Sequence, residues 1–358
     1  MIDPDAFAAL LCDWCLEASE GQQVLVATTT LAGSLIDALH RAILVRRAWP
    51  LMRTARPSQA EDFYELASER QLDSFPPVEL VEIEQIDSYL RIDAPANLRA
   101  LSGVDPERIA RALRARAPIR NARVARRWCG TLWPTGALAQ EAGMSERDYS
   151  AFLSRALFLD RPDPVQAWHE LSHRQQRLID RLAGVREIRI EAEGTDLTLR
   201  VDGRTWINSD GRRNMPSGEV FTGPIEDSAN GTIRFTIPSN REVEVEDVVL
   251  RLRDGEVVEA SARRGEAYLR AALATDAGAR SVGELGIGTN PGIDRPTGST
   301  LLDEKIAGTI HIALGRSYPE TGGKNSSALH WDLICDLRDG GRISADGEQL
   351  DVTTYLSP

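Results

Sequence analysis

The chain has 358 residues, 42% of them hydrophobic and 27% charged, a composition typical of a soluble globular protein long enough for two domains. Its formal net charge of −12 argues against a nucleic-acid partner, because binding to phosphates needs clustered Lys and Arg. No run of about eighteen apolar residues occurs, so we expect neither a membrane span nor a membrane partner.

The N-terminus is acidic, with Asp3 and Asp5, and shows no secretory signal, and four cysteines are too few for a disulfide framework in a chain of this length. We therefore expect a cytoplasmic protein. Cys12 and Cys15 have the spacing of a redox or zinc pair. Because they directly continue the apolar helical run 7–11, and no second pair completes a zinc site, we interpret both as buried helix residues.

The first half of the chain alternates strands and helices, an order typical of parallel βαβ units. Apolar, β-branched runs predict strands at 23–29, 49–52, 78–83, 89–92 and 127–134. Helices are predicted at 31–46, at 136–142 and from Met144 onward, with Ser145 as an N-cap. We therefore predict an α/β fold that begins with an open α/β domain over residues 1–184.

Two motifs in this half have a functional and a structural interpretation. The arginines between Arg108 and Arg127 recur mostly every three or four residues, which is typical of a solvated helical face broken at Pro118 rather than a nucleic-acid site. His169-Glu170-Leu171-Ser172-His173 matches the zinc motif His-Glu-x-x-His. We interpret it as part of a solvated helix and keep a zinc site as the alternative. The buried stripe of that helix is predicted to be Trp168, Leu171, Leu178 and Leu182.

After Gly184 the pattern changes to period-two alternation, which predicts an α+β domain with a largely antiparallel sheet over residues 185–358. Asp254-Gly255 predicts a tight primed turn between strands 243–253 and 256–262. Further strands are predicted at 187–191, 196–201 and 232–237.

Side chains that commonly ligate metals gather in this second domain. His330 and Asp332 are two apart on an extended segment, so both point to the same face of a strand. Imidazoles and carboxylates suit zinc-like ions, and the number of carboxylates is sufficient for two divalent ions. The candidate metal ligands are Glu219, Glu284, Glu304, His311, His330 and Asp332.

The runs at 214–222, 283–290, 303–315 and 322–332 resemble the thermophilic metalloaminopeptidases of the aminopeptidase T and aminopeptidase S type. The resemblance spans most of the chain and is strongest from about residue 185 onward. It implies a two-metal exopeptidase that uses the six ligands above, with Tyr318 beside the metals, and a homodimer that restricts entry to short peptides. The segment between Tyr318 and His330 is short compared with many members, so we infer no substrate preference.

We therefore predict a metal-dependent aminopeptidase that uses two divalent ions, zinc, cobalt or manganese, to activate water and to hold the scissile carbonyl and the free amine. Glu284 is the candidate general base or bridging ligand, since its glycine-rich surroundings allow close backbone approach. Tyr318 is a candidate donor to the oxyanion or a candidate metal ligand, or else an ordinary turn aromatic. Asn290 and Asn325 are candidate hydrogen-bonding groups near the metals or the substrate.

Two other functions stay open. A mononuclear iron dioxygenase would use His311, His330 and Asp332, and some ring-cleaving pyridine dioxygenases are similar to this fold. A non-catalytic binding protein on the same scaffold would be expected to have lost several ligand positions, whereas none is lost. The three glutamates favour the two-metal enzyme, because an iron triad does not require them.

Overall fold

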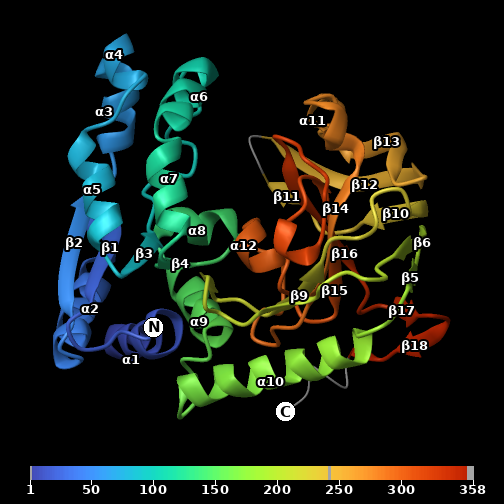
Figure 1. Ribbon diagram of the computed structural model, residues 1–358, viewed down its shortest axis with the longest axis horizontal. Coiled ribbons are helices and arrows are strands. Elements are labelled where there is room, and N and C mark those ends of the chain that lie inside the picture. The colour runs from blue at the N-terminus through green and yellow to red at the C-terminus, as the bar shows by residue number, and fades with distance from the viewer. Residues whose placement is uncertain (1, 241–242, 353–358) are drawn as a thin grey trace. The chain divides into compact units, whose positions relative to one another are not determined.

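The computed structural model describes residues 2–240 and 243–352, and the chain forms two compact units. The first unit comprises residues up to Val165 together with Gly211–Met215, and the second comprises Gln166–Asp210 together with the residues from Pro216 onward. The predicted fold class, an open α/β part followed by an α+β part with a largely antiparallel sheet, is confirmed (Figure 1). None of the described helices is both long and apolar enough to cross a membrane.

The first unit is built on a parallel sheet with the strand order β2-β1-β3-β4-β8. Its strands are β1 (Gln23–Thr29), β2 (Trp49–Ala55), β3 (Ser88–Asp93), β4 (Arg127–Leu132) and β8 (Asn214–Met215). Its helices are α1 (Pro4–Leu10), α2 (Gly33–Val45), α3 (Gln59–Leu66), α4 (Glu69–Leu72), α5 (Pro77–Gln85), α6 (Pro106–Ala115), α7 (Ala117–Val124), α8 (Gly136–Glu141) and α9 (Glu146–Ala156). The strands predicted at 23–29, 49–52, 89–92 and 127–134 are thereby confirmed.

The predicted strand at 78–83 is wrong, because these residues lie in helix α5. Pro77 stands in the first turn of that helix, where a missing N–H costs nothing and the fixed φ favours a helical start. Val78 and Val81 are exposed, whereas Ile83 is buried against Leu25. A β-branched run therefore forms one turn of an amphipathic helix instead of a buried strand.

Three smaller predictions in this unit are confirmed. Cys12 and Cys15 are buried in the π-helix Leu11–Leu16 that continues α1. Ser145 caps α9 through its side-chain oxygen. The arginine-rich stretch forms two successive helices, α6 and α7, and Arg111 of α6 pairs with Asp73 at 2.5 Å.

The second unit contains two antiparallel sheets that share one large hydrophobic core. The larger, eight-stranded sheet has the order β11-β12-β10-β6-β5-β17-β18, with β13 paired to β12, and the smaller has the order β16-β15-β14-β9-β7. The strands are β5 (Glu187–Ala192), β6 (Thr195–Arg200), β7 (Ile207–Ser209), β9 (Glu219–Thr222), β10 (Asn230–Phe235), β11 (Ser239–Asn240), β12 (Glu244–Arg253), β13 (Glu256–Arg264), β14 (Val282–Gly288), β15 (Thr309–Gly315), β16 (His330–Asp336), β17 (Arg342–Ala345) and β18 (Glu348–Leu350). Its helices are α10 (Pro164–Leu182), most of which belongs to this unit, α11 (Glu266–Ala272) and α12 (Thr300–Asp303).

The local predictions for this sheet region are also confirmed. Strands β5, β6 and β10 lie where strands were predicted, and β12 and β13 form the predicted hairpin. Both of its turn residues have a positive φ, 49° for Asp254 and 81° for Gly255, as a primed turn requires.

The two faces of the five-stranded sheet differ sharply in character. Because side chains alternate along a strand, every second residue faces the hydrophobic core of the unit. The residues on that core face include Val220, Leu285, Ile287, Ile310, Ile312, Trp331 and Leu333. The residues between them carry the carboxylates and imidazoles, so a single rigid sheet presents the candidate ligands on its opposite face.

Candidate metal centre

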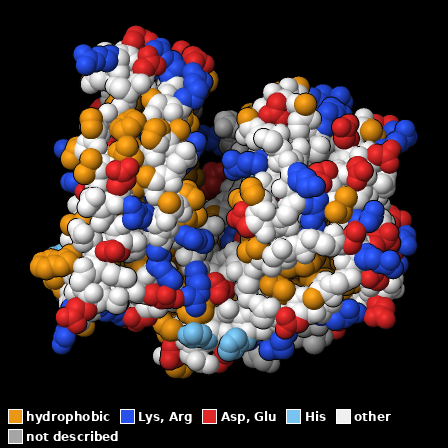
Figure 2. Space-filling view, in the orientation of Figure 1, with side chains coloured by type: hydrophobic (Ala, Val, Ile, Leu, Met, Phe, Trp, Pro, Cys, Tyr) orange, Lys and Arg blue, Asp and Glu red, His pale blue; other side chains and the backbone are white. Residues whose placement is uncertain are grey.

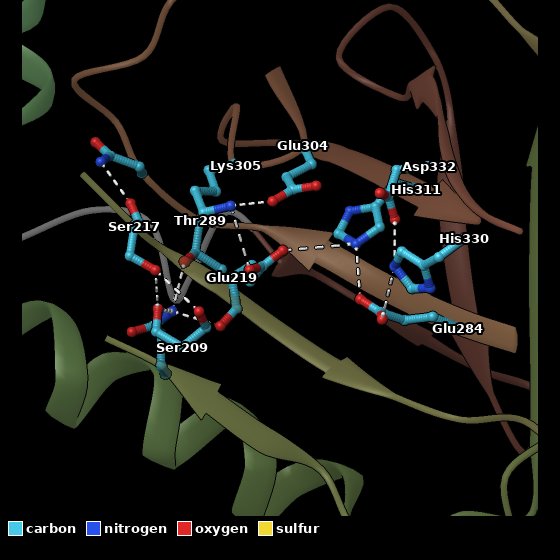
Figure 3. A network of polar contacts seen from close by, with 12 residues as sticks. Ser209, Ser217, Glu219, Glu284, Thr289, Glu304, Lys305, His311, His330 and Asp332 are labelled. Atoms are coloured by element: carbon cyan, nitrogen blue, oxygen red, sulfur yellow. Dashed lines mark hydrogen bonds and ion pairs between the residues drawn. The ribbon is translucent and has the colours of Figure 1, made fainter. Parts of the chain in front are cut away.

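All six predicted ligands come together on this face of the sheet (Figure 3). Five of them lie on strands, Glu219 at the start of β9, Glu284 on β14, His311 on β15, and His330 and Asp332 on β16. The sixth, Glu304, directly follows α12 and reaches the centre from outside the sheet. The strands are neighbours in the order β16-β15-β14-β9, which explains why residues far apart in sequence meet.

A β-bulge puts Val282 and Glu284 on opposite faces of the sheet. The pairing of β14 with β15 shifts between Val282 and Glu284, so that Gly283 is an extra residue. Without this shift, strict alternation would put Val282 on the same face as Glu284. The bulge instead lets Val282 join the hydrophobic core while the carboxylate of Glu284 stays on the ligand face.

The imidazole of His311 lies directly over Gly286 of the neighbouring strand. The two residues are paired in the β-ladder, and a Cβ atom at Gly286 would stand 2.0 Å from Cε1 and 2.1 Å from Nε2 of His311. The glycine therefore leaves the space that the ring occupies. This close approach places the fully buried imidazole between the carboxylates of its neighbours.

The ligand atoms fall into two adjacent groups that share His311. The atoms offered by Glu219, Glu284 and His311 all lie within 4.8 Å of one another, and so do those of Glu304, His311 and Asp332. His311 Nε2 is 3.2 Å from Glu284 Oε1 and 3.5 Å from Glu219 Oε2. Each group is therefore compact enough to hold a divalent ion.

The second histidine is oriented as a metal-binding histidine usually is. His330 Nδ1 donates a hydrogen bond to the carbonyl of Arg316 at 2.8 Å, which fixes the ring. Its Nε2 then faces the carboxylates, 3.5 Å from Asp332 Oδ1 and 3.9 Å from Glu284 Oε2. A backbone carbonyl on the far ring nitrogen is a common outer partner of a ligating imidazole.

The polar atoms at the centre fit a bound cation. Glu284 Oε2 and His311 Nδ1 are buried and have no hydrogen-bond partner among the described residues, a state that proteins normally avoid. Burial lowers the pKa of an imidazole, but the carboxylates outweigh it and raise the pKa of His311 to about 10 and that of His330 to about 9. Burial would raise the pKa of Asp332, yet its hydrogen bond with His330 lowers it to about 2. A site that favours positive charge this strongly suits divalent ions, which displace protons when they bind.

Tyr318 lies beside this centre, as predicted. Its ring packs edge-on against the imidazole of His330, 5.2 Å between centroids, and is tilted against Phe221 at 5.7 Å. Burial, and then the neighbouring Glu284, raise the pKa of the phenol above its usual range. Tyr318 therefore keeps its proton at neutral pH and is available as a hydrogen-bond donor.

The two asparagines singled out from the sequence hold the backbone near the site. Asn290 donates to the carbonyl of Ser217 at 2.7 Å and accepts from the amide of Gly292 at 2.8 Å. Asn325 donates to the carbonyls of Gly278 at 2.8 Å and Gly315 at 2.6 Å. These contacts fix the segments that flank the site strands.

Sequence reasoning missed Lys305, which is part of the same cluster. Its side chain is fully buried, with Nζ 3.3 Å from Glu219 Oε1 and in contact with Glu304 Oε1. The sequence does carry a signal, because the chain has two lysines, at 305 and 324, among 42 basic residues. Because lysine is so rare in this chain, a lysine directly after the predicted ligand Glu304 indicates a candidate member of the site.

The His-Glu-x-x-His motif lies elsewhere, on the solvent face of α10. His169, Glu170 and His173 are exposed, and Figure 2 shows histidine side chains at the surface over this helix. The predicted buried stripe of Trp168, Leu171, Leu178 and Leu182 is confirmed. Among the described residues, the groups compact enough to hold a metal ion include neither histidine. The motif therefore serves as a solvated helix face.

Comparison with known proteins places this geometry in context. A family model described as thermophilic metalloprotease (M29) matches residues 3–353. Aminopeptidase 2 of Geobacillus stearothermophilus is 36% identical over 311 residues, which cover 74% of this chain and 74% of that protein. The solved structure of wild-type AmpT from Thermus thermophilus has a TM-score of 0.84 at 24% identity, covering 97% of this chain and 96% of that chain.

A second solved structure shares the fold alone. It is the 2,5-dihydroxypyridine dioxygenase from Pseudomonas putida KT2440, with a TM-score of 0.62 at 15% identity. The match covers 98% of this chain and 96% of that chain, so the whole two-unit architecture is common to both. Identity this low shows how the backbone is arranged and leaves the chemistry to the site residues.

Proposed function

The chain belongs to the thermophilic metalloprotease family (M29), and we propose that it is an aminopeptidase that releases N-terminal residues from short peptides at a centre of two divalent ions. The observation that carries this proposal is the pair of ligand groups that share His311. Each group joins two carboxylates to the imidazole, and the four carboxylates together carry enough negative charge for two ions.

The proposed ligands divide between the two ions as the groups do. Glu219 and Glu284 would hold one ion with His311, and Glu304 and Asp332 would hold the other. His330, next to both Glu284 and Asp332, completes the set. Mixed imidazole and carboxylate ligands are compatible with zinc, cobalt or manganese.

The protein groups around the ions would carry the proton and the developing charge. When bound, the divalent ions supply Lewis-acid polarisation of the scissile carbonyl and lower the pKa of a water molecule. Glu284 has one carboxylate oxygen without a described hydrogen-bond partner, and in this proposal it would take the proton of that water and pass it to the leaving amine. Tyr318, which stays protonated beside His330, would donate a hydrogen bond to the oxyanion.

A mononuclear iron dioxygenase is the second candidate, favoured by the fold it shares with the Pseudomonas putida enzyme. It would need His311, His330 and Asp332 around one ion. Within the described part of the chain, these three do not form one of the compact groups of ligand atoms, whereas both groups that do form include a glutamate. The geometry thus supports the peptidase better than the dioxygenase.

Two expectations about the setting of the enzyme belong to the same proposal. The resemblance implies a homodimer that restricts entry to short peptides, and we propose the cytoplasm as the compartment in which the enzyme acts. Light scattering on the purified protein measures the mass of the assembly directly. A monomer with full peptidase activity would remove the dimer from the proposal.

Metal content and activity on one purified sample test the function. We expect about two divalent ions per chain and release of N-terminal residues from a short peptide panel after zinc, cobalt or manganese is added. One iron per chain, with oxygen consumption on a hydroxylated pyridine and no peptide cleavage, would favour the dioxygenase. A peptide with a blocked N-terminus is the matched control, because an aminopeptidase needs the free amine.

A further inference from the structure

The proposed metal centre contains a buried lysine in addition to its two histidines. The side chain of Lys305 has no exposed surface, and its ammonium points toward the carboxylates (Figure 3). The Nζ atom is 3.3 Å from Glu219 Oε1 and makes a hydrogen bond to Glu304 Oε1. A fully buried lysine is rare in proteins and is normally paired with acidic groups, as it is here.

The ammonium bridges the two ligand groups. Glu219 belongs to the group with Glu284, and Glu304 belongs to the group with Asp332. The lysine is also fixed through its backbone, because its carbonyl accepts a hydrogen bond from the amide of Asn290 at 3.0 Å. Lys305 therefore holds one carboxylate of each group in place without itself being able to coordinate a metal while it is charged.

The choice of lysine at this position stands out from the rest of the chain. Positive charge is otherwise carried almost entirely by arginine, since Lys305 and Lys324 are the two lysines among 42 basic residues. A lysine ammonium is a compact point charge with three donors, whereas a guanidinium is a wide planar fork. A compact charge is what a closed pocket between two carboxylates can accept.

The positive charge of Lys305 affects how tightly the centre binds a divalent ion. Four carboxylates meet at the centre, and the ammonium of Lys305 lies between two of them, Glu219 and Glu304. Buried carboxylates without a counter-charge are costly, so the ammonium stabilises the centre before any metal arrives. The same ammonium repels a divalent ion placed a few ångströms away, because both carry positive charge in a poorly screened interior.

We propose that Lys305 acts as a built-in cation of the metal centre, which stabilises the metal-free protein and thereby lowers the affinity of the centre for divalent metal. The proposal rests on the metal centre of the proposed function. It assigns Lys305 as a positioning and charge-balancing residue, distinct from the ligands. The direction in which metal affinity changes when Lys305 is replaced distinguishes this role from a purely structural one. If Lys305 only held the ligands in place, its loss would weaken metal binding.

Calorimetric titration of the metal-free protein with zinc provides the test. Lys305→Met keeps the length of the side chain and removes its charge, and we expect it to bind zinc at least about tenfold more tightly than the wild type. Lys324→Met removes an exposed lysine from the same chain and is the matched control. We expect its zinc affinity to stay within about threefold of the wild-type value.

Thermal unfolding completes the same thermodynamic cycle. The metal-free Lys305→Met protein should melt below the metal-free wild type, and saturating zinc should close most of that gap. Unchanged or weaker zinc binding by Lys305→Met would overturn the proposal while leaving the peptidase function intact. A wild-type protein that binds no divalent metal would overturn both, and the peptide assay on the same sample reports on the function separately.

A second measurement covers the case in which Lys305→Met does not fold without metal. Because the chain has two lysines, labelling lysine with ¹³C at Cε gives two side-chain NMR signals, which Lys324→Arg assigns. We expect zinc to shift the Lys305 signal of the wild-type protein and to leave that of Lys324 in place. If the chemical shift of the Lys305 signal does not change when zinc is added, the ammonium does not interact with the metal ion, and the proposal is overturned.

Discussion

Replacing Gly286 by alanine is the sharpest test of how the centre is built. The new Cβ would stand 2.0 Å from Cε1 of His311, and an ordinary contact between carbon atoms needs about 3.5 Å, so the ring must move by about 1.5 Å. Metal ligands tolerate displacements of about 0.2 Å, so a shift of this size removes His311 from both ligand groups. We expect zinc affinity to fall by about 100-fold or more, since disturbing even an outer partner costs about 10- to 100-fold.

Stability should change much less than metal binding in Gly286→Ala. Gly286 is not among the glycines with a positive φ, so alanine adds no backbone strain, and overpacking alone costs about 1–3 kcal/mol. Zinc titration of the metal-free protein, together with its melting temperature, separates the two effects. Gly103→Ala is the matched control, because nothing lies within 4 Å of its added Cβ. Wild-type zinc affinity in Gly286→Ala would refute the description of the His311 ring.

Four further outcomes follow from the same structure. Glu284→Gln should lower kcat by about 100-fold or more, because the amide cannot accept the proton, and full activity with full metal content would remove Glu284 from the mechanism. Tyr318→Phe should keep its metal and lose about 100-fold in kcat with little change in KM, as expected for a donor that acts on the oxyanion. The double variant His169→Ala with His173→Ala should keep wild-type metal content and kcat/KM, since the motif faces solvent; a loss of one metal ion would restore the zinc interpretation. Native protein should not react with a thiol reagent at neutral pH, because all four cysteines are buried and burial raises the pKa of Cys12 to about 12, whereas four thiols should react after denaturation.

The sequence was sufficient for the elements whose signals are local. Residues 23–29 were correctly predicted as a strand because their apolar run is buried in the parallel sheet of the first unit. The hairpin at Asp254-Gly255 was predictable because both turn residues need a positive φ that this dipeptide tolerates. Local signals failed at 78–83, where β-branched residues lie in a helix that begins at Pro77.

The candidate site could be predicted as a set of residues but not as an arrangement. Spacing along the chain identified the carboxylates and imidazoles, and the structure brings all six together. Five of them form two groups that share His311, and this grouping depends on the strand order, which no spacing reveals. Lys305 was missed because its partner Glu219 lies on β9, far away in sequence, and the contact exists only in three dimensions. The membership of a metallopeptidase family is confirmed, while the number of ions and the roles of the single residues stay predictions.

The fifth strand of the parallel sheet has a consequence for how the protein is made. Strand β8 (Asn214–Met215) completes the first unit, where it pairs with β4 and its Met215 carbonyl accepts a hydrogen bond from the hydroxyl of Thr131. Residues 166–210, which belong to the second unit, are synthesised before it. During translation, the edge of β4 that pairs with β8 therefore stays unpaired until residue 215 has been synthesised. Unpaired strand edges promote incorrect association of nascent chains. A fragment that stops at residue 165 would keep that edge exposed permanently.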